Sequence, residues 1–474
     1  MSRSVVIVGG GLAGLSAAVA LAERDFRVTL LDSRPRLGGR ASSFVDQSTG
    51  ELIDNCQHVS MGCCTNFDWF CRTVGIDEFF QTEEQLEFIE PPDLTSGSET
   101  MTPPRSFPLH NGPLPAPLHL ANALRKHHYL SFSDQLRIAT TLRTLARLQS
   151  RPSVSFAQWL VEKGQNAVAM DRFWDVVLVS ALSETLDRID VWSARKVFID
   201  GFMANRDGWK VKVPTVPLDQ LYGSVLSEWL DSHRVDWRLK TQVAQIDVTD
   251  KVQSARLRNG EDIQGSDFIL AVPFHRLREL VPDGVIKDDW LRNVDQFESA
   301  PIASAHLWFD RPFTEKRHAV LIGRFSQWMF HRSAISRTES KGAYYQVVIS
   351  AAREASKLRQ QEVIERVLAD IHEVWPESRS CELIHSRVVT EHRAVFSVVP
   401  GIDALRPQQQ TSIQNLQLAG DWTQTGWPAT MEGAVRSGLL AAENVLRNHG
   451  ESESLLQPDL PTALLSKLVI ARTV

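Results

Sequence analysis

The chain has 474 residues, too many for one ordinary hydrophobic core, so two interwoven or sequential domains are expected. Hydrophobic residues make up 43% and charged residues 23%, values near those of average globular proteins, which excludes a largely disordered or fibrous chain. A formal net charge of -6 excludes the broad basic field that nucleic acid requires, so no nucleic-acid partner is predicted.

The cysteines indicate a reducing location, the cytoplasm, because their number is odd and a core of this size does not need disulfides. The chain enters a predicted strand within four residues of Met1, which leaves no room for a signal segment. No run approaches the roughly 18 apolar residues of a membrane span, so any membrane contact is expected at the surface. His58 and its neighbouring cysteines lack the paired spacing of closed zinc sites, and no metal is predicted. The cysteines are Cys56, Cys63, Cys64, Cys71 and Cys381.

The first elements follow the order strand, turn, helix, strand. Residues 5–8 form a short apolar run that ends in three glycines, residues 12–22 have helical spacing, and residues 28–31 are apolar again. Prolines crowd residues 91–117, which predicts a long irregular connection. Residues 120–205 then show helical apolar spacing, which predicts an inserted helical lobe.

After Pro214 the pattern returns to a nucleotide-binding domain, with a predicted helix over 218–230. Residues from about 300 to 395 leave the nucleotide-binding domain again and combine strands with one helix. This pattern predicts a substrate domain in which a sheet forms one wall of the substrate site. The further predicted strands are 242–248, 254–257, 268–272, 303–309, 344–350 and 416–420, and the further helices 362–372 and 432–446. The sequence therefore predicts an α/β (mixed) fold, a Rossmann-like domain in discontinuous segments with a substrate domain and a helical lobe. The predicted segments are 1–90, 214–299 and 401–450 for the nucleotide domain, 91–213 for the helical lobe, 300–400 for the substrate sheet and 451–474 for an amphipathic tail.

Gly9, Gly11 and Gly14 form the GxGxxG pattern of a phosphate cradle. The first turns the chain, the second lets the backbone approach a pyrophosphate, and the third lets the helix pack on the strand. Asp32 ends the next strand, where a carboxylate can accept both ribose hydroxyl hydrogens. A turn from Arg34 to Arg40 then places guanidinium groups and flexible backbone beside the pyrophosphate.

An acid followed by RxxLGGR resembles the amine oxidase and phytoene desaturase superfamily of flavoproteins. Its second signature is matched almost 400 residues later, at 418–423 and 431–438. The resemblance implies FAD, with Asp421 at the ribityl chain and the start of the last helix at the flavin pyrimidine edge, where N–H groups stabilise negative charge. It also implies an adenine-side contact at Val243. The predicted FAD-binding residues are Gly9, Gly11, Leu12, Ala13, Gly14, Asp32, Arg34, Gly38, Gly39, Arg40, Gln57, His58, Val243, Gly420, Asp421, Met431, Glu432 and Ala434.

Three further stretches, 54–59, 62–66 and 159–174, resemble the bacterial hydroxysqualene dehydroxylases of hopanoid biosynthesis. Cys56 departs from this branch, where glycine is expected, and Ser183-Glu184 stands where asparagine is expected. The implied reaction is the reductive removal of the allylic hydroxyl of hydroxysqualene to give squalene, with hydride from flavin N5. The candidate proton donors are His58, Asp54 and Glu184.

Three alternatives remain open at this point. Carotenoid or phytoene-type desaturation uses the same frame and long polyisoprenes, with the hydride moving in the other direction. Flavin amine oxidases place a lysine on a strand before a Pro-Phe pair, and counting back from Pro312 that position falls near 303–305, where no lysine is present. A non-catalytic flavin-binding scaffold is the third.

A lipophilic isoprenoid would reach the protein from a lipid bilayer, so a peripheral membrane surface is expected. Residues 125–151 carry six basic side chains against Asp134, with leucines between them, and residues 455–474 carry regularly spaced leucines. Either segment can lie on anionic headgroups, and each has a plain alternative as a solvated helix or a core-capping tail. The external reductant and the oligomeric state cannot be derived from the sequence.

Overall fold

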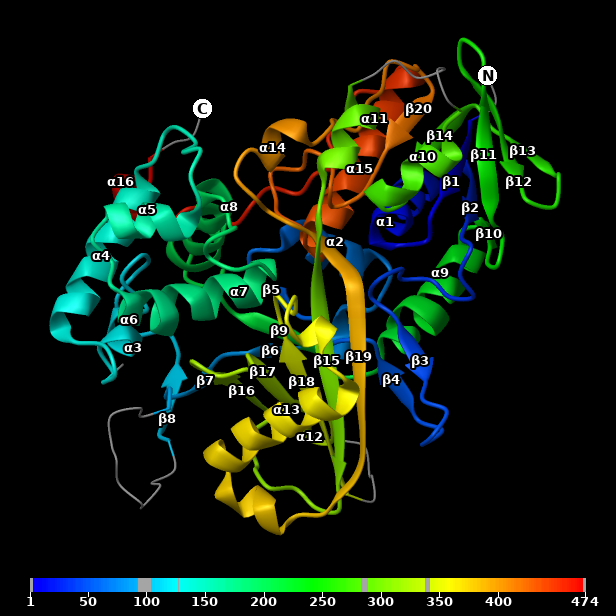
Figure 1. Ribbon diagram of the computed structural model, residues 1–474. Helices are drawn as coiled ribbons and strands as arrows, with labels where there is room; N and C mark the ends of the chain where they lie inside the picture. Colours follow the sequence, from blue (N-terminus) through cyan, green and yellow to red (C-terminus); the bar gives the residue numbers. More distant parts are fainter. Residues whose placement is uncertain (1–2, 93–103, 127, 283–288, 337–341, 472–474) are drawn as a thin grey trace.

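A computed structural model describes residues 3–92, 104–126, 128–282, 289–336 and 342–471, and it confirms the predicted α/β fold. Figure 1 shows a cofactor-side domain, a long-stranded sheet below it and a helical lobe at the left. Parts of three predicted segments, at 93–103, 127 and 472–474, lie outside the described residues.

The cofactor-side domain is built on a parallel sheet in the order β10-β2-β1-β14-β20. These strands come from distant stretches of the chain, namely β1 (Ser4–Val8), β2 (Arg27–Leu31), β10 (Asp236–Arg238), β14 (Asp267–Leu270) and β20 (Leu416–Leu418). The apolar run of β1 is fully buried because both faces of the sheet are covered. Val5 and Ile7 pack with the two long helices on one face, and Val6 and Val8 pack with a small antiparallel sheet of residues 243–264 on the other.

Helices α1 (Leu12–Ala22) and α15 (Met431–Asn448) pack closely beside this sheet. Gly438 permits the contact, because a Cβ there would lie 2.1 Å from the Ala13 carbonyl oxygen. The other elements of this domain are α2 (Thr65–Thr73), η1 (Asp77–Phe79), the π-helical turn η4 (Gln220–Val225), α9 (Leu226–Ser232), β11 (Val243–Val248), β12 (Val252–Leu257), β13 (Asp262–Gln264), η5 (Phe274–Arg276), α10 (Leu277–Leu280), α11 (Trp290–Asn293), η6 (Val294–Gln296) and α14 (Ile402–Leu405).

The second sheet has the order β19-β15-β18-β17-β16-β7-β8. Its longest members, β15 (Ser299–Phe309) and β19 (Leu383–Phe396), run from the cofactor-side domain to the far end of the molecule (Figure 1). Helix α13 (Gln360–Val374) covers one face with buried residues at helical spacing. The other elements are β7 (Leu86–Ile89), β8 (Ser106–Leu109), β16 (His318–Leu321), β17 (Trp328–His331), α12 (Arg332–Ser336), β18 (Ala343–Ile349), η7 (Ala355–Lys357) and η8 (Pro376–Ser380).

Two parts of the predicted organisation differ from the structure. The connection 91–117 is not irregular throughout, because β8 pairs with β7 at the sheet edge and buries Phe107 and Leu109. Pro108 obscured this strand, and an edge strand tolerates proline. The predicted helical segment 91–213 also ends in a strand, β9 (Val211–Pro214), which pairs with β5 (Ser60–Met61) and β6 (Phe80–Glu83).

The helical lobe contains most of the remaining elements. Its helix α4 begins with a capping box between Ser131 and Asp134. A small hairpin, β3 (Ser43–Val45) with β4 (Leu52–Asp54), lies at the opposite side of the molecule (Figure 1). The elements of the lobe are α3 (Ala121–Arg125), α4 (Phe132–Ala146), α5 (Phe156–Glu162), α6 (Ala167–Ala169), α7 (Val176–Leu182), α8 (Val191–Lys196) and the π-helical turns η2 (Met170–Asp175) and η3 (Val197–Met203).

The C-terminal tail connects the two sides of the molecule. Leu455 is buried in the cofactor-side core, while α16 (Leu464–Val469) lies against the helical lobe. The Ser466 hydroxyl donates to the Met203 carbonyl, and the Ala471 N–H donates to the Ala146 carbonyl at the end of α4. The tail therefore covers the core of the cofactor-side domain with Leu455 and packs a short helix, α16, against the helical lobe.

Candidate active site

A cavity of about 710 Å³ lies where β1, β2 and β14 end, between the start of α1 and the upper parts of β15 and β19. Sixteen of the predicted FAD-binding residues line it. Those are Gly9, Gly11, Leu12, Ala13, Asp32, Arg34, Gly38, Gly39, Arg40, Gln57, His58, Val243, Gly420, Asp421, Met431 and Ala434. The sequence motifs, nearly 400 residues apart, thus meet around one space.

The glycines at the start of α1 have different structural roles. Gly9 has φ +115°, and a Cβ there would lie 2.4 Å from the Ala271 carbonyl oxygen. A Cβ on Gly14 would lie 1.9 Å from the Gly9 carbonyl oxygen, so Gly14 serves helix packing and does not line the cavity. A Cβ on Gly11 would meet nothing closer than 3.9 Å. Gly11 caps α1 without a side-chain hydrogen bond, so the first N–H groups of the helix are available to an anion.

Asp32 is fixed beside this helix end by two backbone bonds. The Gly10 N–H donates to its Oδ2 at 2.6 Å, and the Arg34 N–H donates to its Oδ1 at 2.7 Å. The Arg34 guanidinium donates to the Gly39 carbonyl at 3.0 Å, which holds the arginine turn against the cavity. The carboxylate is thereby oriented for the ribose contact that the sequence predicts.

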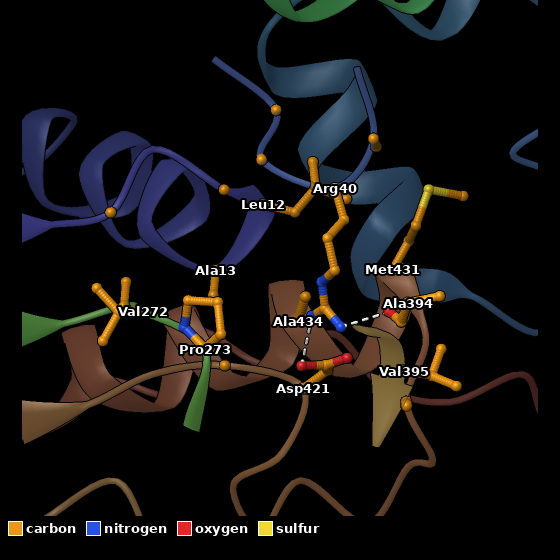
Figure 2. Close-up of a pocket in the computed structure, with 18 of the residues that line it drawn as sticks. Leu12, Ala13, Arg40, Val272, Pro273, Ala394, Val395, Asp421, Met431 and Ala434 are labelled. Atoms are coloured by element: carbon orange, nitrogen blue, oxygen red, sulfur yellow. Dashed lines mark hydrogen bonds and ion pairs between the residues drawn. The ribbon is translucent and has the colours of Figure 1, made fainter. Parts of the chain in front are cut away.

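Arg40 crosses the cavity wall from the loop after β2 to the C-terminal segment. Figure 2 shows its guanidinium between Asp421 and Ala394. One nitrogen donates to Asp421 Oδ1 at 2.7 Å and another to the Ala394 carbonyl at 2.6 Å. Burial acts to lower the pKa of Arg40, but the Asp421 carboxylate outweighs it and raises the pKa above its ordinary value. A fixed cation therefore stands in the middle of the cavity wall.

The start of α15 contributes Met431 and Ala434 to the cavity, but the Glu432 side chain turns away from it. Glu432 accepts hydrogen bonds from the N–H groups of Asn66 and Phe67 and from the Asn66 amide, at the first turn of α2. Burial raises the pKa of Glu432. Its side chain ties α15 to α2, and the cofactor contact predicted at this position is one of the backbone at the start of α15, which stays a prediction.

The rest of the lining comes from residues 55–59, from Ser180, Ala181 and Ser183 at the end of α7, and from Ile302 of the second sheet. Gln57 is held from behind by Arg332, whose Nη1 donates to Gln57 Oε1 at 3.1 Å. His58 lies with Nδ1 3.0 Å from the Cys56 carbonyl oxygen. Burial lowers the pKa of His58, so the imidazole is neutral at pH 7, with its proton on Nδ1.

The other two proton-donor candidates do not line the cavity. Asp54 Oδ1 accepts from the Ser43 hydroxyl at 2.7 Å and the Leu218 N–H at 2.9 Å, so it shapes the loop. Glu184 is fully buried and pairs with Arg353 at 2.5 Å.

Burial alone would raise the pKa of Glu184, but hydrogen bonds from Arg353 and Ser397 lower it below the ordinary value. A carboxyl that stays ionised and lies outside the cavity does not suit proton donation there. Its prediction as a proton donor is wrong.

The family of the chain follows from comparison with known proteins. Residues 12–446 match the model of the family described as flavin containing amine oxidoreductase. The chain belongs to this family. FAD is therefore its cofactor.

Two similar proteins cover almost the whole chain. The 15-cis-phytoene desaturase of Arabidopsis thaliana is 25% identical over 94% of this chain and 80% of its own length. A probable zeta-carotene desaturase of Synechococcus elongatus is 26% identical over 93% of this chain and 98% of its own. Among solved structures, an oxidoreductase from Methanosarcina mazei has a TM-score of 0.71 at 16% identity, covering 92% of this chain and 98% of that one, and supports the fold.

The cavity fits the cofactor of the family by its own geometry. The open space at Gly11 and the free N–H groups of α1 suit the pyrophosphate, and Asp32 suits the adenosine ribose. Arg40 would face the pyrophosphate and ribityl region from the opposite wall. Bound FAD would accept or donate a hydride at flavin N5. The side chains at 55–59 and 180–183 would then line the remaining space, where a substrate carbon can meet the ring.

Sequence reasoning missed several cavity residues that carry no motif. Glu391, Ala394 and Val395 come from the end of β19, whose sequence shows only a long strand. His275 lies on η5 and lines the same space, where burial lowers its pKa. Ser180 lies on α7. The apolar spacing of this helix does not reveal which of its residues face the cavity and which face the core.

Proposed function

We propose that this chain transfers a hydride between FAD and a long polyisoprenoid, and that its reaction is the reductive dehydroxylation of hydroxysqualene to squalene. The observation that carries the proposal is the position of residues 55–59. This stretch resembles the dehydroxylase branch and lines the same cavity as the phosphate cradle, beside Ile302 of the second sheet. The similarity to carotenoid desaturases over 93–94% of the chain supports a polyisoprene as the substrate class.

Amine oxidation is disfavoured by the chemistry of the cavity wall. No lysine occurs among the described residues that line the cavity. The strand position where flavin amine oxidases carry lysine is occupied by Ala303, Ser304 and Ala305 on β15. Ile302, the neighbouring cavity residue, adds an apolar surface that suits a hydrocarbon.

Desaturation of a carotenoid precursor is the second candidate, and two observations favour it. The relatives named above are desaturases. His58, neutral and protonated on Nδ1, leaves Nε2 free to accept a proton, as desaturation requires. Dehydroxylation instead needs a proton at the departing hydroxyl, which this tautomer does not supply.

The test is an anaerobic mixing experiment. FAD-loaded protein is reduced photochemically and mixed with hydroxysqualene, while oxidised protein is mixed with phytoene and with putrescine. Dehydroxylation predicts that the flavin absorbance near 450 nm returns only with hydroxysqualene and that squalene forms. Bleaching by phytoene would establish desaturation instead, and bleaching by putrescine alone would overturn the polyisoprene proposal.

We further propose that the helical lobe docks on an anionic bilayer from which the substrate is taken. Among the described residues, no helix is long and apolar enough to cross a membrane. The lobe and α16 nevertheless expose large apolar side chains, with Phe132 and Leu464 each 81% exposed. Arg137, Arg143 and Lys467 are exposed on the same two helices, which suits anionic headgroups.

Vesicle sedimentation tests this surface. The double variant Leu464→Asp with Leu468→Asp should lose binding to phosphatidylglycerol vesicles by about 10-fold or more, because each exposed leucine contributes on the order of 1–2 kcal/mol when it enters the bilayer. Ile384→Asp is the matched control, since this exposed apolar residue lies on β19, away from the lobe. Equal binding of both variants, or no binding of the unaltered protein, would contradict the proposal.

A further inference from the structure

The face of β15 opposite α13 carries an unusual series of side chains. Residues of a strand alternate between the two faces of a sheet, and Ala303, Ala305, Leu307 and Phe309 form the apolar core with α13. The opposite face carries Ile302 at the cavity, followed by Ser304, His306 and Trp308. Polar groups therefore extend from the cavity into a buried layer of the protein.

Hydrogen-bonded groups lie at both ends of this layer. Cys56, which lines the cavity, lies beside Ser304, whose hydroxyl acts to lower the pKa of the thiol against the larger raising effect of burial. The Gln346 amide donates to Ser304 Oγ at 3.1 Å. At the far end, His306 Nδ1 lies 2.7 Å from the hydroxyl of Tyr344, a partly exposed residue. Ser304, His306 and Gln346 are each fully buried.

Among the described residues, no hydrogen bond joins the Ser304–Gln346 pair to the His306–Tyr344 pair. His306 Nε2 and Gln346 Oε1 are both buried and have no hydrogen-bond partner there. The two residues are directly opposite each other in the β15–β18 register. Each unpaired buried polar atom costs about 1–3 kcal/mol, and a bound water is the usual way in which proteins satisfy such pairs.

We propose that a buried water bridges His306 Nε2, Gln346 Oε1 and Ser304 Oγ, and that it completes a proton-transfer route from Cys56 at the cavity to Tyr344. Gln346 orients the water, while the thiol, the hydroxyls, the water and the imidazole pass the proton. The route rests on the proposed hydride-transfer function, because it supplies the proton that this function requires.

Each of the two candidate reactions transfers one proton per turnover. In dehydroxylation the C–O bond breaks, the hydroxyl takes up one proton and leaves as water, and the carbon accepts a hydride from reduced flavin. In desaturation one C–H bond gives its hydride to oxidised flavin and the adjacent C–H bond gives up one proton as the double bond forms. One proton must therefore enter or leave the cavity in either reaction, and bound FAD and a hydrocarbon substrate would displace water from it.

The imidazole is suited to this role in its neutral form. Burial lowers the pKa of His306 to about 3. The Arg387 cation on β19 also lowers this pKa, whereas the Asp46 carboxylate acts to raise it. A neutral imidazole accepts a proton at one ring nitrogen while it releases one at the other. His306 thus conducts a proton without storing a charge in the sheet.

The first arm of the test is independent of the substrate. A crystal structure of the FAD-loaded protein at a resolution that shows ordered water should have density within hydrogen-bond distance of His306 Nε2 and Gln346 Oε1. Gln346→Leu should remove this density while the fold is retained. Absence of the water from the unaltered protein would overturn the proposal, whatever the protein acts on.

The second arm measures proton transfer with whichever polyisoprenoid changes the flavin oxidation state. His306→Ala should slow this half-reaction by about 10- to 100-fold, within the usual range for a proton-transfer group, and raise its solvent isotope effect. Added imidazole should restore the rate, which a merely structural role would not allow. Trp308→Phe is the matched control, because the indole N–H donates to Glu51 outside the route and phenylalanine keeps an aromatic ring stacked on Tyr344.

Two results would overturn the relay. One is an unchanged rate and isotope effect in both His306→Ala and Gln346→Leu, and the other is a slow His306→Ala that imidazole does not rescue. Failure of every polyisoprenoid to change the flavin would contradict the proposed function instead, and the water density would then decide the inference.

Discussion

The two ends of the cavity are built in different ways. At the cofactor end, backbone groups and glycines of α1 form the wall, and Asp32 is fixed by neighbours close in sequence. At the reaction end, side chains from distant segments meet, such as Gln57 held by Arg332, 275 residues away. The comparison shows that cofactor recognition is encoded locally, whereas the environment of the substrate depends on tertiary contacts.

The largest expected effects come from two glycines at the cofactor end, Gly11, which leaves space for the pyrophosphate, and Gly14, which allows close helix packing. Gly11→Val should reduce FAD affinity at least about 100-fold, roughly 2.7 kcal/mol, because its side chain enters the space for pyrophosphate. The FAD-free form should keep its melting temperature, since nothing lies near that Cβ. Gly14→Val should instead unfold the protein. Calorimetric titration and thermal melting check both, and retention of FAD by Gly11→Val would contradict the cradle.

At the reaction end, His58 and Asp54 should behave differently. For desaturation, His58→Ala should lower the flavin half-reaction rate by about 100-fold, because the free Nε2 would accept the proton. Asp54→Asn should keep the rate within about three-fold and lose about 1–3 kcal/mol of stability, because this carboxylate bonds to Ser43 and Leu218 outside the cavity. Stopped-flow absorbance and urea unfolding measure the two effects. A large rate loss in Asp54→Asn would reverse the assignment.

Arg40 and Arg24 offer a comparison of ion pairs of equal length. Each guanidinium lies 2.7 Å from its carboxylate, but Asp421 is buried while Glu453 is exposed. Arg40→Met should weaken FAD binding about 10- to 100-fold, in line with about 1.5–3 kcal/mol for a charged hydrogen bond. Arg24→Met should change it by less than two-fold, as expected for a surface pair. Equal effects of the two variants on FAD titrations would contradict a special role for Arg40.

The smallest effects concern two carboxyls of the helical lobe with opposite pKa shifts. The pKa of Glu184 is below its ordinary value of 4.5, so the stability it contributes is complete above pH 4.5 and is lost as the pH falls through the lowered pKa. Burial, aided by Asp171 and Asp187, raises the pKa of Asp175 to about 7. Its ionisation therefore destabilises the fold as the pH rises from about 4 to 7.

Urea unfolding at several pH values distinguishes these two groups. Asp175→Asn should raise the free energy of unfolding at pH 8 by about 1–3 kcal/mol and leave it unchanged at pH 3.5. Glu184→Gln should lower it at pH 7, where Arg353 loses its ionised partner. A destabilised Asp175→Asn at pH 8 would show that this carboxylate has a partner when it is ionised.

The residues that the sequence predicts for the cofactor end line one cavity, because their positions follow from local chain geometry. The GxGxxG turn, the acid at Asp32 and the paired motif at 418–438 require particular residues at fixed spacing, and the cavity contains nearly all of them. The motif position of Glu432 does not reveal that its side chain points to α2 instead of the cavity. Glu184 was misassigned because its partner Arg353 is 169 residues away. The β8 strand was missed because a proline in an edge strand resembles a loop.

Product deuteration tests the central claim, hydride transfer from FAD to a polyisoprenoid, most directly. FAD-loaded protein is reduced without oxygen in D₂O, where flavin N5 exchanges its hydrogen with solvent, and is mixed with hydroxysqualene. The account predicts squalene with one deuterium at the carbon that carried the hydroxyl, formed as the flavin is oxidised. Recovery of unchanged hydroxysqualene with flavin still reduced would contradict dehydroxylation, and squalene without deuterium would contradict hydride transfer from the flavin.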